Sequence, residues 1–262
     1  MGALLTSLSA SAAAACNSPA LGAFAGLERS RWEEFDAQGK SLLRERGTLT
    51  VSSLQASGRC SSIDWTAQWT HSHGMRDYDG VTSTQQPLQT QSRLRTQALT
   101  IAAWLPLEAA GWSVGSQLGY RQIQRDIANV GNVLGYPEQF EAVQAGLGMR
   151  YQAALGERVR FAAEGWLGAD PGGRVSVDLP RADPVTLPLG NNHSLALSLQ
   201  LEGGEAVQPG WSWHAEVAYR RDQTSAGAAR AFVRNGVIVG VALQPRIIQQ
   251  HLGSNVALTY RF

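Results

Sequence analysis

The segment Val256-Ala257-Leu258-Thr259-Tyr260-Arg261-Phe262 alternates large apolar residues with small or polar ones and stops on an aromatic residue. Successive side chains of a β-strand point to opposite faces, so Val256, Leu258 and Tyr260 would share one face. The residues between them would share the other. The segment therefore predicts a strand with one apolar face and one more polar face.

The same two-residue period returns along the whole chain. Between residues 141 and 153, one face carries Val143, Ala145, Leu147, Met149 and Tyr151, and the other carries Gln144, Gly146, Gly148, Arg150 and Gln152. Segments with the same alternation span residues 63–70, 111–121, 160–167, 194–202 and 211–220. Alternation is a weak signal in one segment, but its repetition favours a sheet with one apolar face.

Composition decides what kind of sheet this is. The chain has 262 residues, 44% hydrophobic and 16% charged, with a net charge of +1. No stretch approaches the roughly 18–20 continuous apolar residues of a membrane helix. A membrane protein without such a helix must close its strands into a barrel, because lipid cannot satisfy free backbone groups. The near-neutral charge argues against a nucleic-acid partner.

We therefore predict an all-β fold, an antiparallel transmembrane β-barrel of the bacterial outer membrane. The expected strands lie near residues 27–36, 40–57, 61–74, 89–105, 111–126, 140–154, 157–169, 192–202, 210–222 and 248–262. Their connections alternate between short and long, which predicts short periplasmic turns, long extracellular loops and periplasmic termini. The last strand, ending at Phe262, would also be recognised by the barrel-insertion machinery.

Asn235-Gly236 is a two-residue hairpin signal inside the last long connection. Its flanks, residues 231–234 and 237–241, are shorter than the roughly 9–11 residues that a spanning strand needs. We expect a ribbon above the membrane and about ten barrel strands, or twelve if the ribbon is longer.

The start of the chain predicts three parts: a partial signal peptide over residues 1–15, a periplasmic segment over 16–26 and the barrel over 27–262. Cys16 directly follows the expected cleavage site. It could be lipidated, removed, or paired with Cys60 in the oxidising periplasm. If the two do not pair, Cys60 is a lone structural cysteine.

Aromatic and charged residues have separate expected places. The aromatic residues should anchor the barrel at the headgroup levels as two girdles: Trp65, Trp69, Trp112, Trp211, Trp213, Tyr151 and Tyr260. The inward charges should pair and fill a narrow lumen: Arg121, Arg150, Arg160 and Arg220 with Asp64, Glu164, Glu202 and Glu216. A filled lumen would argue against a conducting pore.

Chemistry is expected where the first long loop begins. Asp77 and Asp79 are two residues apart at the end of a predicted strand, so they could face one site and orient a water. If the phase of Trp65 and Trp69 continues, both point outward unless Gly74 carries a bulge. His71 and His73 also share a face and could hold a metal or act on a lipid headgroup, although no third ligand accompanies them.

A ten-strand barrel with Asp-x-Asp above its third strand resembles the omptin family of outer-membrane proteases. Gly119-Tyr120-Arg121-Gln122 and the segment 135–140 add short matches. The resemblance implies that Asp77 and Asp79 form one acidic pair, facing an Asp-x-His pair, with lipopolysaccharide supporting the active form. The loop 170–180 has no Asp-x-His, and the nearest histidine is His193.

The prediction from sequence is thus an integral outer-membrane barrel that serves as a binding or structural protein, with lipid and lipopolysaccharide as partners and no cofactor or metal. The alternatives are an omptin-like surface protease or lipid A hydrolase, with Asp77 and Asp79 as catalytic residues, and a small channel.

Overall fold

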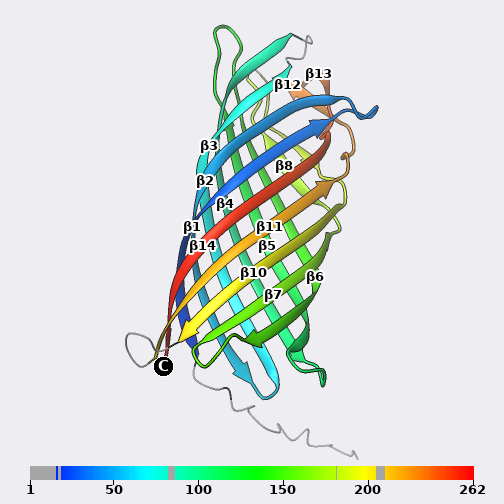
Figure 1. The fold of residues 1–262 in the computed structure, drawn as a ribbon. Helices are drawn as coiled ribbons and strands as arrows, with labels where there is room; N and C mark the ends of the chain where they lie inside the picture. The colour runs from blue at the N-terminus through cyan, green and yellow to red at the C-terminus, as the bar shows by residue number, and fades with distance from the viewer. Residues whose placement is uncertain (1–15, 17–18, 82–85, 181, 205–209) are drawn as a thin grey trace, which may run out of the picture.

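Ten strands form a closed antiparallel barrel in the computed structural model, which describes residues 16, 19–81, 86–180, 182–204 and 210–262 (Figure 1). The barrel strands are β1 (Ala20–Phe35), β2 (Ser41–Cys60), β3 (Ile63–Val81), β4 (Pro87–Pro106), β5 (Trp112–Ile127), β6 (Pro137–Ala154), β7 (Val159–Asp170), β10 (Asn192–Gly204), β11 (Trp211–Thr224) and β14 (Arg246–Arg261). Pairing of β1 with β14 and of β5 with β6 closes the ring. No helix in the described ranges is long and apolar enough to cross a membrane.

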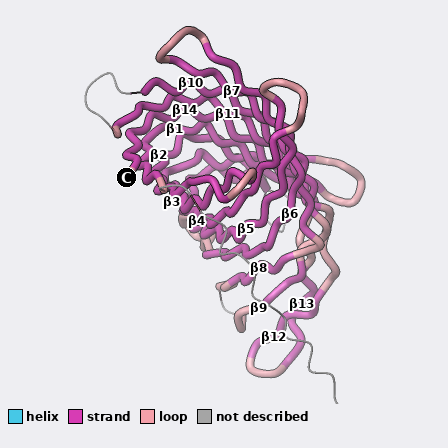
Figure 2. Tube along the Cα trace, turned by 90° about the horizontal axis from the view of Figure 1, so that it is seen from below, coloured by secondary structure: helices cyan, strands magenta, loops and turns pink. Residues whose placement is uncertain are grey.

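Four short strands extend the barrel at one end. They are β8 (Gly173–Val177), β9 (Val185–Pro188), β12 (Arg230–Arg234) and β13 (Val237–Ala242). β8 pairs with the start of β6, and β9 pairs with β8. β12 and β13 form a sheet of their own around Asn235-Gly236, where both residues have positive φ. Seen along the barrel, these strands lie to one side of the ring (Figure 2). The hairpin is therefore outside the barrel, and ten strands is confirmed over twelve.

The two ends of the barrel differ. Both ends of the described barrel chain, Ala20 and Arg261, pair with each other at the end that also carries the turns after β2, β4 and β6 (Figure 1). We call this the turn side, and the end with β8, β9, β12 and β13 the loop side. On the turn side a disulfide joins Cys16 to Cys60, so pairing is the alternative that the structure shows. Residues 1–15, the predicted signal peptide, lie outside the described ranges.

Two strands are longer than expected. β1 begins at Ala20 rather than residue 27, because small residues continue the alternation between Leu21 and Leu27. β3 continues to Val81, so Asp77 and Asp79 lie in a strand and not, as expected, in a loop. β3 pairs with β2 and β4 without a register shift, so Gly74 carries no bulge.

The outward face changes character along the barrel axis. On the turn side, register rows across β1 to β5 are apolar, such as Ala23, Leu54, Trp69, Leu99 and Tyr120. Elsewhere in this belt Leu147 and Leu167 are 72% and 69% exposed. Nearer the loop side the rows become polar. Since β2 and β4 have 20 residues each, about twice what a spanning strand needs, the barrel projects beyond its apolar belt.

The interior is divided in the same way. On the loop side a hydrophobic core fills the barrel, with Leu49, Leu94, Phe140, Val175 and Ile247 among its buried members. On the turn side lies a cavity of about 990 Å³, which we call the turn-side chamber. The lumen is thus filled at one end only.

The predicted filling by inward ion pairs is therefore wrong for the turn side, although some of the pairs form. Arg150 contacts Asp64 at 2.8 Å, and Arg160 lies 3.8 Å from Glu202. Glu164 and Glu216 make no ion pair with any described residue. Most of the other residues that line the chamber are small or polar, namely glycine, alanine, serine, threonine and glutamine, and they leave a lumen of ten strands open.

Candidate functional site

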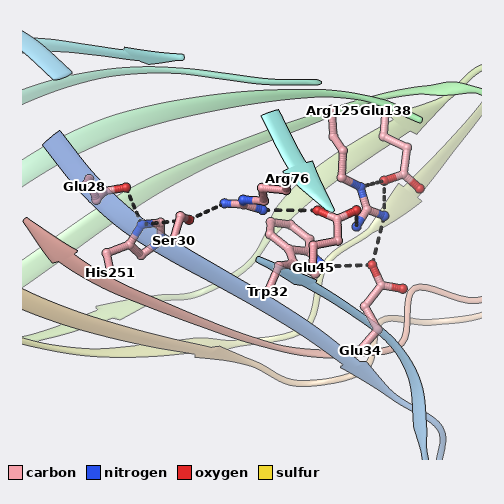
Figure 3. Close-up of polar contacts among 9 residues, drawn as sticks. All are labelled: Glu28, Ser30, Trp32, Glu34, Glu45, Arg76, Arg125, Glu138 and His251. Atoms are coloured by element: carbon pink, nitrogen blue, oxygen red, sulfur yellow. Dashed lines mark hydrogen bonds and ion pairs between the residues drawn. The ribbon is translucent and has the colours of Figure 1, made fainter. Parts of the chain in front are cut away.

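A layer of buried charge lies within the loop-side core: on β2, Glu45 falls between the core residues Leu43 and Leu49, and Leu49 is the one nearer the turn-side chamber. Figure 3 shows its polar contacts. We call it the closing layer, and its members are Trp32, Glu34, Glu45, Arg76, Arg125 and Glu138. They come from β1, β2, β3, β5 and β6, each at an inward position of its strand. Segments distant in sequence therefore meet in one cross-section of the barrel.

Arg125 is the centre of this layer. Its Nε donates to Glu138 at 2.7 Å, Nη1 to Glu45 at 3.4 Å and Nη2 to Glu34 at 2.9 Å. The guanidinium is almost fully buried, as are the carboxylates around it. A planar guanidinium with donors on several sides suits three acceptors at once, which a lysine could not replace. Arg125 thereby compensates three buried carboxylates.

Trp32 seals the middle of the layer and has no solvent exposure. Its indole Nε1 donates to Glu34 at 2.9 Å. The guanidinium carbons of Arg125 and Arg76 lie 4.8 and 5.6 Å from its ring centre, and Phe140 packs edge-on at 5.1 Å. Cation–π contacts of this kind are strongest when desolvated. The ring and the two arginines therefore form one packed unit.

A chain of polar contacts leads from the closing layer to the chamber (Figure 3). Arg76 donates to Glu45 at 3.3 Å and to Ser30 Oγ at 2.6 Å. Ser30 lies 3.3 Å from His251 Nδ1, which is 2.6 Å from Glu28. Glu28 and His251 line the chamber. Ser30 and Glu28 both contact Nδ1 of His251, so the hydroxyl and the carboxylate do not lie on opposite nitrogens of the imidazole, as a Ser-His-Glu triad requires.

Asp77 and Asp79 lie elsewhere, exposed on the outer face of β3. In register, Asp77 is opposite Arg46 and Asp79 is opposite Arg44. Arg76 before them and Tyr78 between them point inward, as the alternation requires. The two carboxylates thus share a face but not a cleft.

The structure does not bring a histidine to this acidic pair from across the barrel. His193 is exposed on β10, which is separated from β3 by β2, β1, β14 and β11. His71 and His73 stack on each other at 5.4 Å on β3 itself, toward the turn side of Asp77. No group of three metal-binding side chains is gathered in the described ranges. A catalytic role for Asp77 and Asp79 stays a prediction.

Exposed arginines gather on the outer wall directly above the apolar belt. We call Arg29, Arg46, Arg93 and Arg95 the outer arginine patch. Arg29 and Arg93 fall in one register row across β1 to β4, and Arg95 and Arg46 fall in the rows on either side of it. Within the described residues none of the four makes an ion pair, whereas Arg31 and Arg44 nearby both contact Glu33 at 2.7 Å.

Sequence reasoning missed the closing layer. Arg76 was assigned to a loop, and Glu45 is hidden between two outward arginines. The signal that could have revealed them is the strand phase itself: Arg76 and Tyr78 continue the inward positions of Ser72.

Burial raises the pKa of the Tyr136 phenol, which precedes β6 and packs against the hydrophobic core.

No protein-family model and no curated protein matches the sequence. Solved structures with a similar arrangement include the outer membrane protease OmpT from Escherichia coli, with 12% identity, 93% of this chain and 97% of that chain covered, and a TM-score of 0.46. The translocator domain of the autotransporter NalP from Neisseria meningitidis has 10% identity, 92% and 88% coverage, and a TM-score of 0.47. Neisserial surface protein A has 11% identity, 95% and 99% coverage, and a TM-score of 0.38.

Proposed function

We propose that this chain is an integral β-barrel of the bacterial outer membrane that acts as a binding or structural protein at the cell surface. In this proposal the loop side is extracellular and both termini are periplasmic. The observation that carries it is the outer wall, on which apolar rows give way to the outer arginine patch. Such a wall matches hydrocarbon below a layer of anionic headgroups.

The apolar belt supports insertion because its large side chains are exposed in the described part of the chain. The outward leucines of β10 alternate with inward polar residues, as lipid contact requires. Trp112 packs on Tyr151 and Trp211 on Tyr260 at the turn side, which would place an aromatic girdle at that interface. An exposed apolar surface of this extent would aggregate in water.

The outer arginine patch supports lipopolysaccharide as the partner. Four guanidiniums that make no ion pair with any described residue lie just beyond the belt, at the level where the lipid phosphates would be. Arginine binds phosphate through paired N–H donors, and such contacts are charge-assisted. The patch therefore has the chemistry and the depth to hold phosphorylated lipid A.

The lumen argues against permeation. The closing layer and the hydrophobic core on both sides of it fill the cross-section with packed side chains. A substrate that entered the chamber would meet buried ion pairs rather than an aqueous path. We therefore place the binding of surface partners on the outer wall and the loop-side strands.

The test measures binding of lipid A to the refolded full chain in detergent. Arg93→Gln with Arg95→Gln is expected to weaken binding at least about tenfold, since each charge-assisted contact contributes roughly 1.5–3 kcal/mol. The matched control is Arg158→Gln with Arg160→Gln, two exposed arginines at the turn side. Dephosphorylated lipid A should not distinguish the variants. Equal binding by both double variants would exclude the patch as the lipopolysaccharide site.

A further inference from the structure

The turn-side chamber has the features of a binding site. Its volume of about 990 Å³ is at the upper end of the roughly 300–1,000 Å³ of small-molecule sites. Its lining runs from Glu28 and His251 beneath the closing layer to Gly204, Arg261 and Phe262 at the turn-side rim. The chamber is therefore closed at its inner end and extends to the rim.

Polar side chains, four of them amides, line two opposite walls. Gln55, Gln68 and Thr100 form one register row on β2, β3 and β4. Gln200, Glu216 and Asn255 form another on β10, β11 and β14, and β3 and β10 lie on opposite sides of the ten-strand ring. The walls thus present donors and acceptors toward each other across the chamber.

Several of these polar groups lack a protein partner. The amides of Gln55, Gln68 and Gln117 make no side-chain hydrogen bond with any described residue, and Asn255 Oδ1 is buried without a partner. The three glutamines are only half-buried and line the chamber, so their amides are free to bond to a ligand or to the water that fills it, whereas Asn255 Oδ1 is the one fully buried group among these that would normally be satisfied. Each amide can both donate and accept, which matches hydroxyl groups better than ions.

The charge and the aromatic surface narrow the ligand class. Five carboxylates and five arginines line the chamber, so it has no net charge to attract an ion. Trp166 lines it half-buried, with its ring 4.4 Å from that of Trp104, whose face Arg150 covers at 4.8 Å. A rigid aromatic surface among planar amides suits the apolar faces and hydroxyl edges of sugar rings.

We propose that the turn-side chamber is a blind binding site for a neutral oligosaccharide that enters from the turn side. The amide rows would bond its hydroxyl groups, Trp166 would pack on a ring face, and the closing layer would stop it at the inner end. This site is separate from the outer arginine patch, and the proposal for the chamber does not depend on the proposal for the patch.

The experiment is calorimetric titration of the refolded full chain in detergent with maltotetraose and with tri-N-acetylchitotriose. Spermidine and citrate serve as cationic and anionic comparison probes. Saturable binding of at least one saccharide is expected, together with a change in tryptophan fluorescence. Gln68→Ala with Gln117→Ala should weaken that binding about tenfold, because two hydrogen bonds are lost without loss of packing.

Gln97→Ala is the matched control, since Gln97 is exposed on the outer wall of β4. It should leave saccharide affinity unchanged, and Trp166→Leu should abolish the fluorescence change. Absence of saccharide binding would overturn the proposal and leave a water-filled lumen. Preferential binding of spermidine or citrate would overturn the ligand class, and equal effects of the inner and outer glutamine variants would overturn the location.

Discussion

The loop-side and turn-side halves of this barrel are built on the same strands, yet one is packed and the other is hollow. On β2, Leu49 is fully buried in the core, whereas Val51, two residues toward the turn side, lines the chamber. The alternation is identical in both halves, and only the size and charge of the inward residues differ. Whether the lumen of a ten-strand barrel is filled or open therefore depends on which residues point inward, while the arrangement of the strands stays the same.

The largest effect is expected at the centre of the closing layer. Arg125→Ala leaves Glu34, Glu45 and Glu138 buried without their shared guanidinium, so the free energy of unfolding should fall by about 3–5 kcal/mol. The control is Arg160→Ala, which breaks a largely exposed pair with Glu202 and should cost about 1 kcal/mol or less. Urea unfolding of refolded protein measures both, and similar losses would mean that the layer is not the structural centre of its half.

The matched pair on β2 tests the two halves directly. Leu49→Ala should cost about 2–5 kcal/mol, because a cavity opens in a packed core. Val51→Ala should cost less, about 1–2 kcal/mol, because Val51 is also buried, at 8% exposure, but it lines the chamber, so its truncation opens no enclosed cavity. The same unfolding measurement applies. Equal costs at both positions would show that the turn-side half is packed in solution.

The sequence predicts the barrel well because the evidence for it is local. Alternation at residues 141–153 and 194–202 is sufficient to place strands and to turn their apolar faces outward. The start of β1 escaped detection because alanine and glycine give little contrast between faces. The alternation of apolar and polar residues is therefore sufficient to predict the strands wherever the alternating side chains are large.

The interior could not be predicted in the same way, because it depends on which strands face each other. Arg125 on β5 meets Glu34 on β1 and Glu45 on β2, and these contacts depend on register and barrel closure. The sequence identified inward charges such as Arg150 and Glu164 correctly, but not whether they fill the lumen. Filling is set by distances across the barrel, which a single strand does not encode.

The smallest effect on stability is expected on the outer wall beside the closing layer. Asp77→Asn and Asp79→Asn should change the free energy of unfolding by less than about 0.5 kcal/mol, because both carboxylates are exposed and make no ion pair with the described residues. Arg76→Gln, one position away and inward, should cost roughly 1–3 kcal/mol, because Glu45 loses a buried partner. The different effects of these neighbouring residues on the free energy of unfolding would then follow from the face of the strand that each one occupies.

The same aspartate variants test the omptin-like alternative. A peptide library incubated with the refolded chain and lipopolysaccharide would reveal any hydrolysis, and hydrolysis should disappear in both variants if Asp77 and Asp79 orient the attacking water. Hydrolysis that survives both changes would remove these residues from the mechanism. If the folded wild-type chain cleaves nothing, Asp77 and Asp79 are polar residues of the outer wall, and the asymmetry between the packed and hollow halves becomes the feature that a function must explain.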